Sequence, residues 1–259
     1  MEIINQLQIR EIFHLEFLKW FSRKVKIDFY ALKGGANLRF FFKSFRYSED
    51  MDLDVSGIRK DALLDAVMAI LGSKLFNDSL NSYGIERVIP PDISRAKQTS
   101  TTQRFKLHLI TYTGEDLFTK VEFSRRGFKG EIVAESVSDS VTRTYKMPPL
   151  IVPHYGVKAT VEQKVSALGL RSAVQARDIF DLYILSSQCE PGEWGAGEIA
   201  PLTLKEASER VFEVSFEQFR DTVVSYLPVQ DQKSYNSSGI WDEVRIKTAR
   251  FLEELESKA

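Results

Sequence analysis

The feature that most constrains this chain is a stretch in which acidic and apolar side chains alternate, residues 50–55, which read Asp-Met-Asp-Leu-Asp-Val. Alternation with a period of two is typical of a β-strand that buries one face. The three aspartates then share the other face, where like charges repel one another and weaken the sheet. A cation would relieve that repulsion, and ligands that are all oxygen suit Mg²⁺ or Mn²⁺.

A glycine pair lies upstream of the acidic strand. Gly34 and Gly35 follow an apolar run at 27–32 and a single lysine, Lys33. Because glycine has no side chain, backbone N–H groups at this position can approach a phosphate closely. Together, the glycine pair and the acidic strand predict a metal-dependent nucleotide site.

Composition narrows the classes of protein to which the chain can belong. Of its 259 residues, 43% are hydrophobic and 27% are charged, which is ordinary for a globular protein with a substantial core. Its 35 Lys and Arg residues are balanced by 36 Asp and Glu residues. No net charge therefore draws the whole chain to nucleic acid or to an anionic membrane, although a local basic patch stays open.

Cysteine, histidine and hydropathy patterns exclude several further classes. Cys189 is the only cysteine, so no intrachain disulfide can form, and the three histidines are scattered without the spacing of a zinc site. The first ten residues lack the pattern of a signal peptide. No apolar run approaches the roughly 20 residues that a membrane span needs. We therefore expect a cytoplasmic protein with no membrane partner.

The first part of the chain is predicted to alternate helix and strand. Residues 2–24 have the apolar spacing of an amphipathic helix, and residues 27–32 form a short strand. The glycine pair turns the chain into a second helix over 36–45. The acidic strand over 50–55 follows, and then a helix over 59–71.

A predicted hairpin carries a further acid. Residues 104–112 alternate cleanly and are expected to pair with a strand over 117–125. Glu122 is a lone acid between apolar residues of the second strand. Either it lies on a solvated face, or it joins Asp50 and Asp52 from a neighbouring strand and completes a carboxylate triad.

The chain changes character at residues 147–149, which read Met-Pro-Pro, so we place a boundary there between domains 1–149 and 150–259. One short strand is expected before it, at 141–145. Helices are expected beyond it over 160–170, 173–187, 202–212, 215–226 and 239–257, with a loop at 188–201. The predicted fold is α/β (α+β), a mixed β-sheet core flanked by helices and followed by a helical C-terminal region.

Two acids on the helix over 173–187 have two interpretations. Asp178 and Asp181 share one face at a spacing of i, i+3, and Arg177 is placed to pair with Asp181 at i, i+4. In the first, the pair locks its helix through Arg177 and Arg171; the second follows from the family resemblance given below.

Four elements of the chain form a recognisable set. They are Lys33-Gly34-Gly35 with Arg-Tyr-Ser-Glu-Asp-Met-Asp-Leu at 46–53, Thr-Lys-Val-Glu-Phe at 119–123, a lysine helix at 162–171 and Arg-Asp-Ile-Phe-Asp-Leu-Tyr at 177–183. In this order they resemble the AbiEii/AbiGii toxin-like nucleotidyltransferases, a branch of the DNA polymerase β-like superfamily. The resemblance covers roughly residues 27–187. Glu122 stands where aspartate is usual, and the glycine pair replaces the Gly-Ser of the wider superfamily.

The resemblance implies a metal-binding role for the acids. Asp50 and Asp52 would be catalytic ligands of Mg²⁺ or Mn²⁺. Glu122 would be the third ligand or the base that activates the acceptor hydroxyl. Asp54 would be peripheral.

The resemblance also implies the nucleotide-binding residues of the first domain. Gly34 and Gly35 would cradle the triphosphate through backbone N–H groups, with Lys33 near the phosphates or the acceptor. Arg46 and Ser48 would shape the loop or touch the nucleotide.

The second domain would complete the active-site cleft. Lys164 would contact the triphosphate as a catalytic and nucleotide-binding residue, because a lysine acts as a point charge that can follow moving phosphate oxygens. Asp178 and Asp181 would be catalytic acids that face the same cleft.

The function implied by the resemblance is metal-dependent transfer of a nucleotidyl group from an NTP to an acceptor hydroxyl. The acceptor would be tRNA, and the protein would be the toxin of a type IV toxin–antitoxin or phage-defence system, with a cognate antitoxin as its partner. Three alternatives remain open: a nucleotidyltransferase for small molecules such as aminoglycosides, a catalytically silent NTP-binding module, and a purely structural α/β domain.

Overall fold

The computed structural model describes residues 4–94, 96–189, 194 and 199–258. The chain divides into two compact units. The first unit comprises residues 1–41 and 47–155, and the second comprises residues 42–46 and 156–259. The chain therefore leaves the first unit for five residues, immediately before the acidic strand, and then returns to it.

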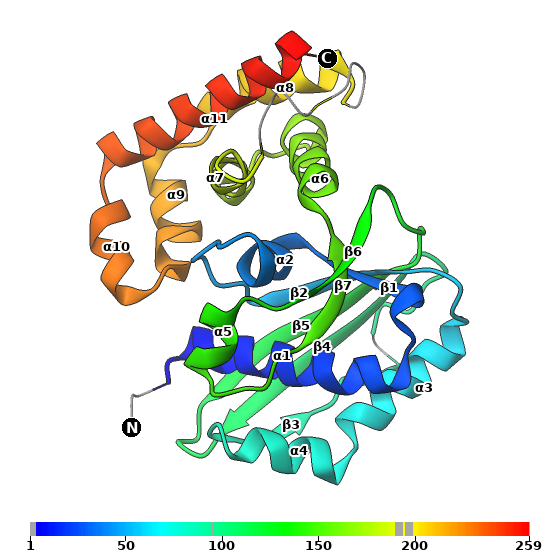
Figure 1. The fold of residues 1–259 in the computed structure, drawn as a ribbon. Helices are drawn as coiled ribbons and strands as arrows, with labels where there is room; N and C mark the ends of the chain where they lie inside the picture. The colour runs from blue at the N-terminus through cyan, green and yellow to red at the C-terminus, as the bar shows by residue number, and fades with distance from the viewer. Residues whose placement is uncertain (1–3, 95, 190–193, 195–198, 259) are drawn as a thin grey trace. The chain divides into compact units, whose positions relative to one another are not determined.

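The first unit contains a seven-stranded mixed sheet with the order β3-β4-β5-β2-β1-β7-β6 (Figure 1). Its strands are β1 Tyr30–Lys33, β2 Asp50–Val55, β3 Ile85–Ile89, β4 Thr102–Thr111, β5 Asp116–Ser124, β6 Ile132–Ser136 and β7 Ile151–Tyr155. The pairs β2–β5 and β1–β7 are parallel, and the other four pairs are antiparallel. The predicted fold class, a mixed sheet with flanking helices, is confirmed.

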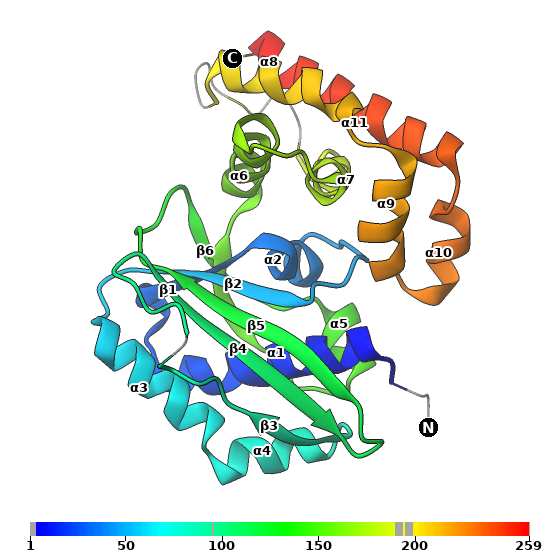
Figure 2. The ribbon, with the colours of Figure 1, turned by 180° about the vertical axis from the view of Figure 1, so that it is seen from behind.

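Helices cover one face of this sheet. The helices of the first unit are α1 Gln6–Lys24, α2 Gly34–Phe41, α3 Lys60–Leu71, α4 Lys74–Asn81 and α5 Asp139–Thr144. In Figures 1 and 2, α1, α3 and α4 lie on the same side of the sheet, whereas α2 packs against β1 and β2. The predicted helix 2–24 is confirmed as α1, although the helix begins later, at Gln6 after the N-cap Asn5; residues 1–3 lie outside the described residues.

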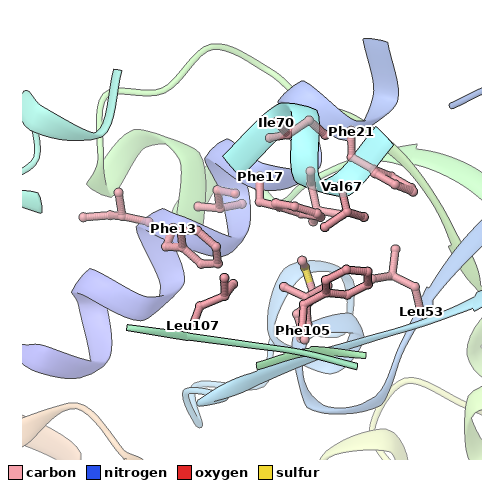
Figure 3. Packing of buried hydrophobic residues seen from close by; sticks show 14 of the residues in the cluster. Phe13, Phe17, Phe21, Leu53, Val67, Ile70, Phe105 and Leu107 are labelled. Carbon is pink, nitrogen blue, oxygen red and sulfur yellow. The ribbon is translucent and has the colours of Figure 1, made fainter. Parts of the chain in front are cut away.

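The core lies between these helices and the strands. Phe13, Phe17 and Phe21 project from α1 toward Phe105 and Leu107 of β4, as Figure 3 shows. All five side chains are buried. Because successive strand residues point to opposite faces, this packing leaves the even-numbered residues of β4 and β5 on the other face of the sheet.

The predicted short strand at 141–145 is wrong. Residues 139–144 form α5, and the strands of this region are β6 and β7 on either side of it. Val141 and Tyr145 are both buried, and a spacing of four puts them on one side of a helix, but it also puts them on one face of a strand, so their spacing alone did not distinguish the two.

The second unit is helical, as predicted for the C-terminal region. Its helices are α6 Val157–Leu170, α7 Ala176–Leu185, α8 Pro201–Arg210, α9 Phe216–Thr222, α10 Val229–Tyr235 and α11 Ser238–Lys258. The rings of Phe219 and Trp241 stack 4.3 Å apart, and Phe180 packs edge-on against Phe45, a residue of the 42–46 segment. Apolar packing therefore holds both parts of this unit together.

Two helical predictions need adjustment. The helix expected over 215–226 ends at Thr222, and a single 3₁₀ turn, Val224–Tyr226, follows it. Most of the loop expected at 188–201 lies outside the described residues. Among the helices that the structure describes, none combines the length and the apolar character that a membrane crossing requires.

Candidate active site

The register of β2 and β5 brings the three predicted metal ligands together. The two strands run parallel, with Asp52 opposite Glu122 and Asp50 opposite Lys120. Residues that face one another on neighbouring strands have side chains on the same face of a sheet. Asp50, Asp52 and Glu122 therefore form a cluster of carboxylates on the face that α1 does not cover.

Two basic side chains neutralise part of this cluster. Lys120 Nζ lies 3.0 Å from Asp50 Oδ2 and 4.0 Å from Glu122 Oε2. Arg104 of β4 donates from Nε to Glu122 Oε2 at 2.5 Å. Asp50 and Glu122 are thus paired with cations that belong to the same sheet.

Asp52 differs from the other two acids. Within the described residues its carboxylate has neither a hydrogen bond nor an ion pair. Burial raises the pKa of Asp52, and the negative charges of Glu122 and Asp50 raise it further, against the opposing effect of Lys120 and Lys33. The cluster therefore holds one carboxylate whose negative charge is poorly compensated by the protein.

Gly34 brings the backbone close to this carboxylate. It begins α2, directly after β1, and its φ of +71° is in the left-handed region that favours glycine. A Cβ at this position would lie 3.1 Å from Asp52 Oδ2. The sequence needs glycine here both for the turn and for the approach to Asp52, and Gly35 continues the same helix start.

Lys33 ends β1 opposite Asp52, but its ammonium group pairs with another acid. Lys33 Nζ donates to Asp54 Oδ1 at 2.6 Å, and the Tyr155 hydroxyl donates to Asp54 Oδ2 at 2.7 Å. Asp54 is buried, with 7% exposure, and its carboxylate fixes the position of the Lys33 ammonium group. This structural role was not anticipated from the sequence.

The structure places the two loop residues Arg46 and Ser48 in different settings. The Ser48 hydroxyl donates to the backbone carbonyl of Asp50 at 2.8 Å and fixes the beginning of β2. Arg46 belongs to the second unit, where its guanidinium donates to both oxygens of Asp181 at 3.1–3.3 Å.

The second unit contains a buried network of ions. Lys164 Nζ of α6 lies 2.6 Å from Asp181 and 3.0 Å from Asp178, both on α7, and Arg171 donates to Asp178 at 2.5 Å. With Arg46 the network has three cations and two anions, so it carries a net charge of +1. The side chains of Asp178 and Asp181 are at most 1% exposed, whereas those of Lys164 and Arg171 are 11% and 42% exposed.

Electrostatics stabilise the charged forms in this network. Burial alone would raise the pKa of Asp181, but Arg46 and Lys164 outweigh it and hold the pKa below its usual value. Burial alone would likewise lower the pKa of Lys164, and Asp181 and Asp178 raise it instead. The expected pair of Arg177 with Asp181 is wrong, because Arg177 donates to Gln175 Oε1 and Asp181 is occupied by Arg46 and Lys164.

The carboxylate cluster fits a divalent cation by its chemistry. No three His, Cys, Asp or Glu side chains in the described part of the chain already stand as ligands around one point. Asp50, Asp52 and Glu122 nevertheless offer only oxygen donors, which suit Mg²⁺ or Mn²⁺. A divalent cation would compensate the charge of Asp52, which the protein itself leaves without an ion pair.

Arg104 is a site residue that the sequence analysis missed. Its signal was present, because β4 and β5 form the predicted hairpin, and counting back from the turn sets residue 104 opposite residue 122. A basic residue directly opposite an acid on neighbouring strands is a favourable cross-strand pair. The pairing register of the hairpin would have found it.

Comparison with known families gives one match that spans most of the chain. The family model described as nucleotidyl transferase AbiEii toxin, type IV TA system, matches residues 16–253. No curated protein matches the chain.

Solved structures show that the fold is shared. A candidate nucleotidyltransferase from H. pylori aligns with a TM-score of 0.61 at 19% identity, over 98% of each chain. JHP933 from Helicobacter pylori aligns at 0.57 and 18% identity, over 98% of this chain and 93% of that one. MenT4, a nucleotidyltransferase toxin from Mycobacterium tuberculosis H37Rv, aligns with a TM-score of 0.57 at 17% identity, over 96% of this chain and 84% of that one. At these identities the likeness concerns the fold.

Proposed function

Because the chain belongs to the AbiEii nucleotidyl transferase toxin family, we propose that it transfers a nucleotidyl group from an NTP to a hydroxyl of tRNA, with Mg²⁺ or Mn²⁺ as its metal. One observation carries the proposal: the register of β2 and β5 sets Asp52 beside Glu122, with Asp50 two residues away on the same face. Nucleotidyl transfer requires neutralisation of charge and in-line positioning more than covalent participation of the protein.

In this proposal Asp50, Asp52 and Glu122 hold the metal. When bound, the metal neutralises the phosphate oxygens and the charge that develops on them during transfer. Glu122 also accepts the proton of the attacking hydroxyl, and Arg104 holds its carboxylate in place through the 2.5 Å hydrogen bond. Lys120 pairs with Asp50 and Glu122 in the structure, and it would be available to a phosphate once a metal compensated these two acids.

Gly34, Gly35 and Lys33 are proposed to bind the triphosphate. The first turn of a helix has backbone N–H groups without an intrahelical acceptor, and it favours negative charge. Gly34 lies against Asp52, so a triphosphate bound there is next to the metal. Lys33 remains near it, anchored by Asp54.

The ion network of the second unit is proposed to supply Lys164 as a further phosphate contact. Its net charge of +1 and the partial exposure of Lys164 and Arg171 favour an anion. Asp178 and Asp181 position Lys164, and Arg46 neutralises Asp181. In the first unit, Ser48 keeps the beginning of β2 in register.

The biological role proposed is that of a toxin that acts in the cytoplasm and is neutralised by a cognate antitoxin. The family description, a type IV toxin–antitoxin system, supports a toxin with an antitoxin as its partner. Modification of tRNA would stop translation, which accounts for toxicity.

The experiment that tests the proposal is incorporation of labelled nucleotide into total RNA. Purified protein is incubated with each NTP and Mg²⁺, and Asp52→Asn is compared with Asp65→Asn, a change of an exposed aspartate on α3. We expect label in the tRNA fraction with wild type and Asp65→Asn, and none with Asp52→Asn. Label on a small-molecule acceptor alone, or NTP binding without any transfer, would contradict the proposal.

A further inference from the structure

The open face of the sheet carries a row of basic side chains beside the carboxylate cluster. Arg104, Lys106 and His108 alternate along β4 and lie on the face that α1 does not cover. Alternate residues of a strand are about 7 Å apart, and neighbouring strands about 4.8 Å. The row therefore lies one strand from Glu122 on β5 and two strands from Asp50 and Asp52 on β2, as the strand order β2, β5, β4 in Figure 2 illustrates.

The residues of this row line a hollow. It has a volume of about 560 Å³, and its basic lining residues are Lys97, Arg104, Lys106 and His108, with Asp92 as the one acid. The loop that carries Lys97 is held against the strand, because the backbone N–H of Arg104 donates to the carbonyl of Lys97 at 2.9 Å. Arg104 is paired with Glu122 and His108 with Asp116, so Lys97 and Lys106 are the lining cations that attract an anion, with Asp92 as the opposing acid of the lining.

An exposed aromatic side chain lies next to the hollow. Phe118 of β5 is 44% exposed and lies opposite His108, and the two rings meet edge to face with centroids 5.8 Å apart. Asp116 Oδ1 lies 2.9 Å from His108 Nδ1 and orients that imidazole. Proteins bind single-stranded nucleic acid through large exposed aromatic side chains beside basic groups, because every base can stack on an aromatic ring.

The strand order places these features on two opposite sides of the carboxylate cluster. The glycine turn and Lys33 lie on the β1 side of the carboxylate cluster, and the basic row lies on the β4 side. If the triphosphate takes the first side, as the proposed function has it, the acceptor must approach from the second. An acceptor that brings phosphates and unpaired bases matches the charges and the ring found there.

We propose that the open face of β4 and β5 binds the single-stranded acceptor end of the RNA. Its phosphates contact Lys97, Lys106 and Arg104, and one base stacks on Phe118 beside His108. The inference rests on the proposed function for the reaction, but binding of RNA to this face is measurable without any transfer. Arg104 has two neighbours, since it also holds Glu122.

Binding is tested first, without NTP and without metal. The probe is a fluorescent single-stranded oligoribonucleotide with a free 3′ hydroxyl, followed by anisotropy over a range of salt concentrations. We expect Lys106→Gln and Lys97→Gln each to weaken binding at low salt and to reduce the slope of log affinity against log salt by about 1. Phe118→Ala is expected to weaken binding roughly 5- to 100-fold, and Phe118→Trp to restore it.

Matched controls lie elsewhere on the chain. Lys74→Gln removes an exposed lysine at the beginning of α4, and Phe212→Ala removes a side chain that is 52% exposed in the second unit. Both are expected to bind the oligonucleotide as wild type does. Thermal unfolding of every variant shows that the fold is kept, since none of the changed side chains is buried.

Kinetics then separate this inference from the proposed function. In transfer assays Lys106→Gln and Phe118→Ala should raise the KM for RNA, while kcat and the affinity for Mg-NTP measured by calorimetry stay at the wild-type values. The inference is overturned if wild type does not bind the oligonucleotide, or if Lys106→Gln and Phe118→Ala bind it as wild type does. A wild type that binds RNA through these residues but transfers no nucleotide would contradict the proposed function and leave the binding face established.

Discussion

Asp52 is the residue on which the proposed chemistry depends most, and it is also a source of instability. Its half-buried carboxylate has no ion pair among the described residues and is repelled by Glu122 and Asp50. A raised pKa means that the charged form is disfavoured by the folded state, so this carboxylate opposes folding at neutral pH. The proposed cation would compensate this charge.

We predict that Asp52→Asn raises the thermal unfolding temperature of the metal-free protein at pH 7 while it abolishes transfer. The neutral amide keeps the shape of the side chain and removes the repulsion. Differential scanning calorimetry in EDTA measures the shift, and Asp65→Asn is the control. An unchanged or lower unfolding temperature for Asp52→Asn would show that the charge of Asp52 is compensated after all.

His14 is a second buried titratable residue, and it makes the fold sensitive to acid. Thr119 Oγ1 donates to the carbonyl of Glu49, so it accepts from His14 Nε2, 2.9 Å away. Burial lowers the pKa of His14 to about 3, with a smaller contribution from Arg10. The folded state therefore requires the neutral imidazole.

We predict that stability falls as the pH drops from about 6.5 toward 3, because the unfolded chain binds the proton that the folded chain refuses. The loss from His14 reaches at most about 1.4 kcal/mol per pH unit in this window. Urea unfolding at several pH values measures it, and His14→Gln, which can still donate to Thr119, should have a flatter profile. Parallel profiles for wild type and His14→Gln would rule out this role of His14.

At the scale of the element, Gly34 has two roles in the turn from β1 into α2. Gly34 has a φ of +71° and lies against Asp52. We predict that Gly34→Ala destabilises the fold by about 1–2 kcal/mol through the strained backbone and also weakens Mg-NTP binding. Gly114→Ala is the matched control, because its φ is +82° but nothing lies within 4 Å of the added Cβ.

Unfolding by urea and calorimetric titration of Mg-NTP measure the two effects separately. Both variants should lose similar stability, and only Gly34→Ala should lose affinity for Mg-NTP. Equal affinities in the two variants would mean that this turn does not bind the triphosphate.

The contact between α6 and α7 depends on the buried ion network. We predict that Asp181→Ala destabilises the protein by about 3–5 kcal/mol, because Arg46 and Lys164 are then left without their buried partner. Adding Lys164→Met should recover part of that loss. Asp221→Ala removes an exposed partner of Arg220 and should cost less than about 1 kcal/mol; a similar cost for both changes, measured by urea unfolding, would argue against the network.

Local patterns predicted the elements that carry the carboxylates. β2 and the β4–β5 hairpin alternate cleanly, so their strands and their exposed faces follow from the sequence. The edge strand β6 is exposed and lacks such alternation, and β7 contains Pro153, so neither gave a strand signal. The parallel pairing of β2 with β5 joins segments that are about 70 residues apart, which no local pattern encodes.

At the scale of the whole molecule, the residues of the candidate site were predicted better than their contacts. Asp50, Asp52 and Glu122 come together in the first unit, and Lys164 joins Asp178 and Asp181 in the second. Arg46 lies in the second unit, where it pairs with Asp181, a long-range partner that sequence spacing does not reveal.

Family membership and site geometry together make transfer of a nucleotidyl group the central claim. The position of the label in the NTP tests it most directly, since nucleotidyl transfer keeps the α-phosphate on the acceptor and releases pyrophosphate. Wild-type protein with Mg²⁺ and tRNA should attach label from α-labelled NTP and none from γ-labelled NTP, with one pyrophosphate released per nucleotide attached. Label from γ-labelled NTP on the RNA, or no label from either in the presence of Mg²⁺, would contradict the account.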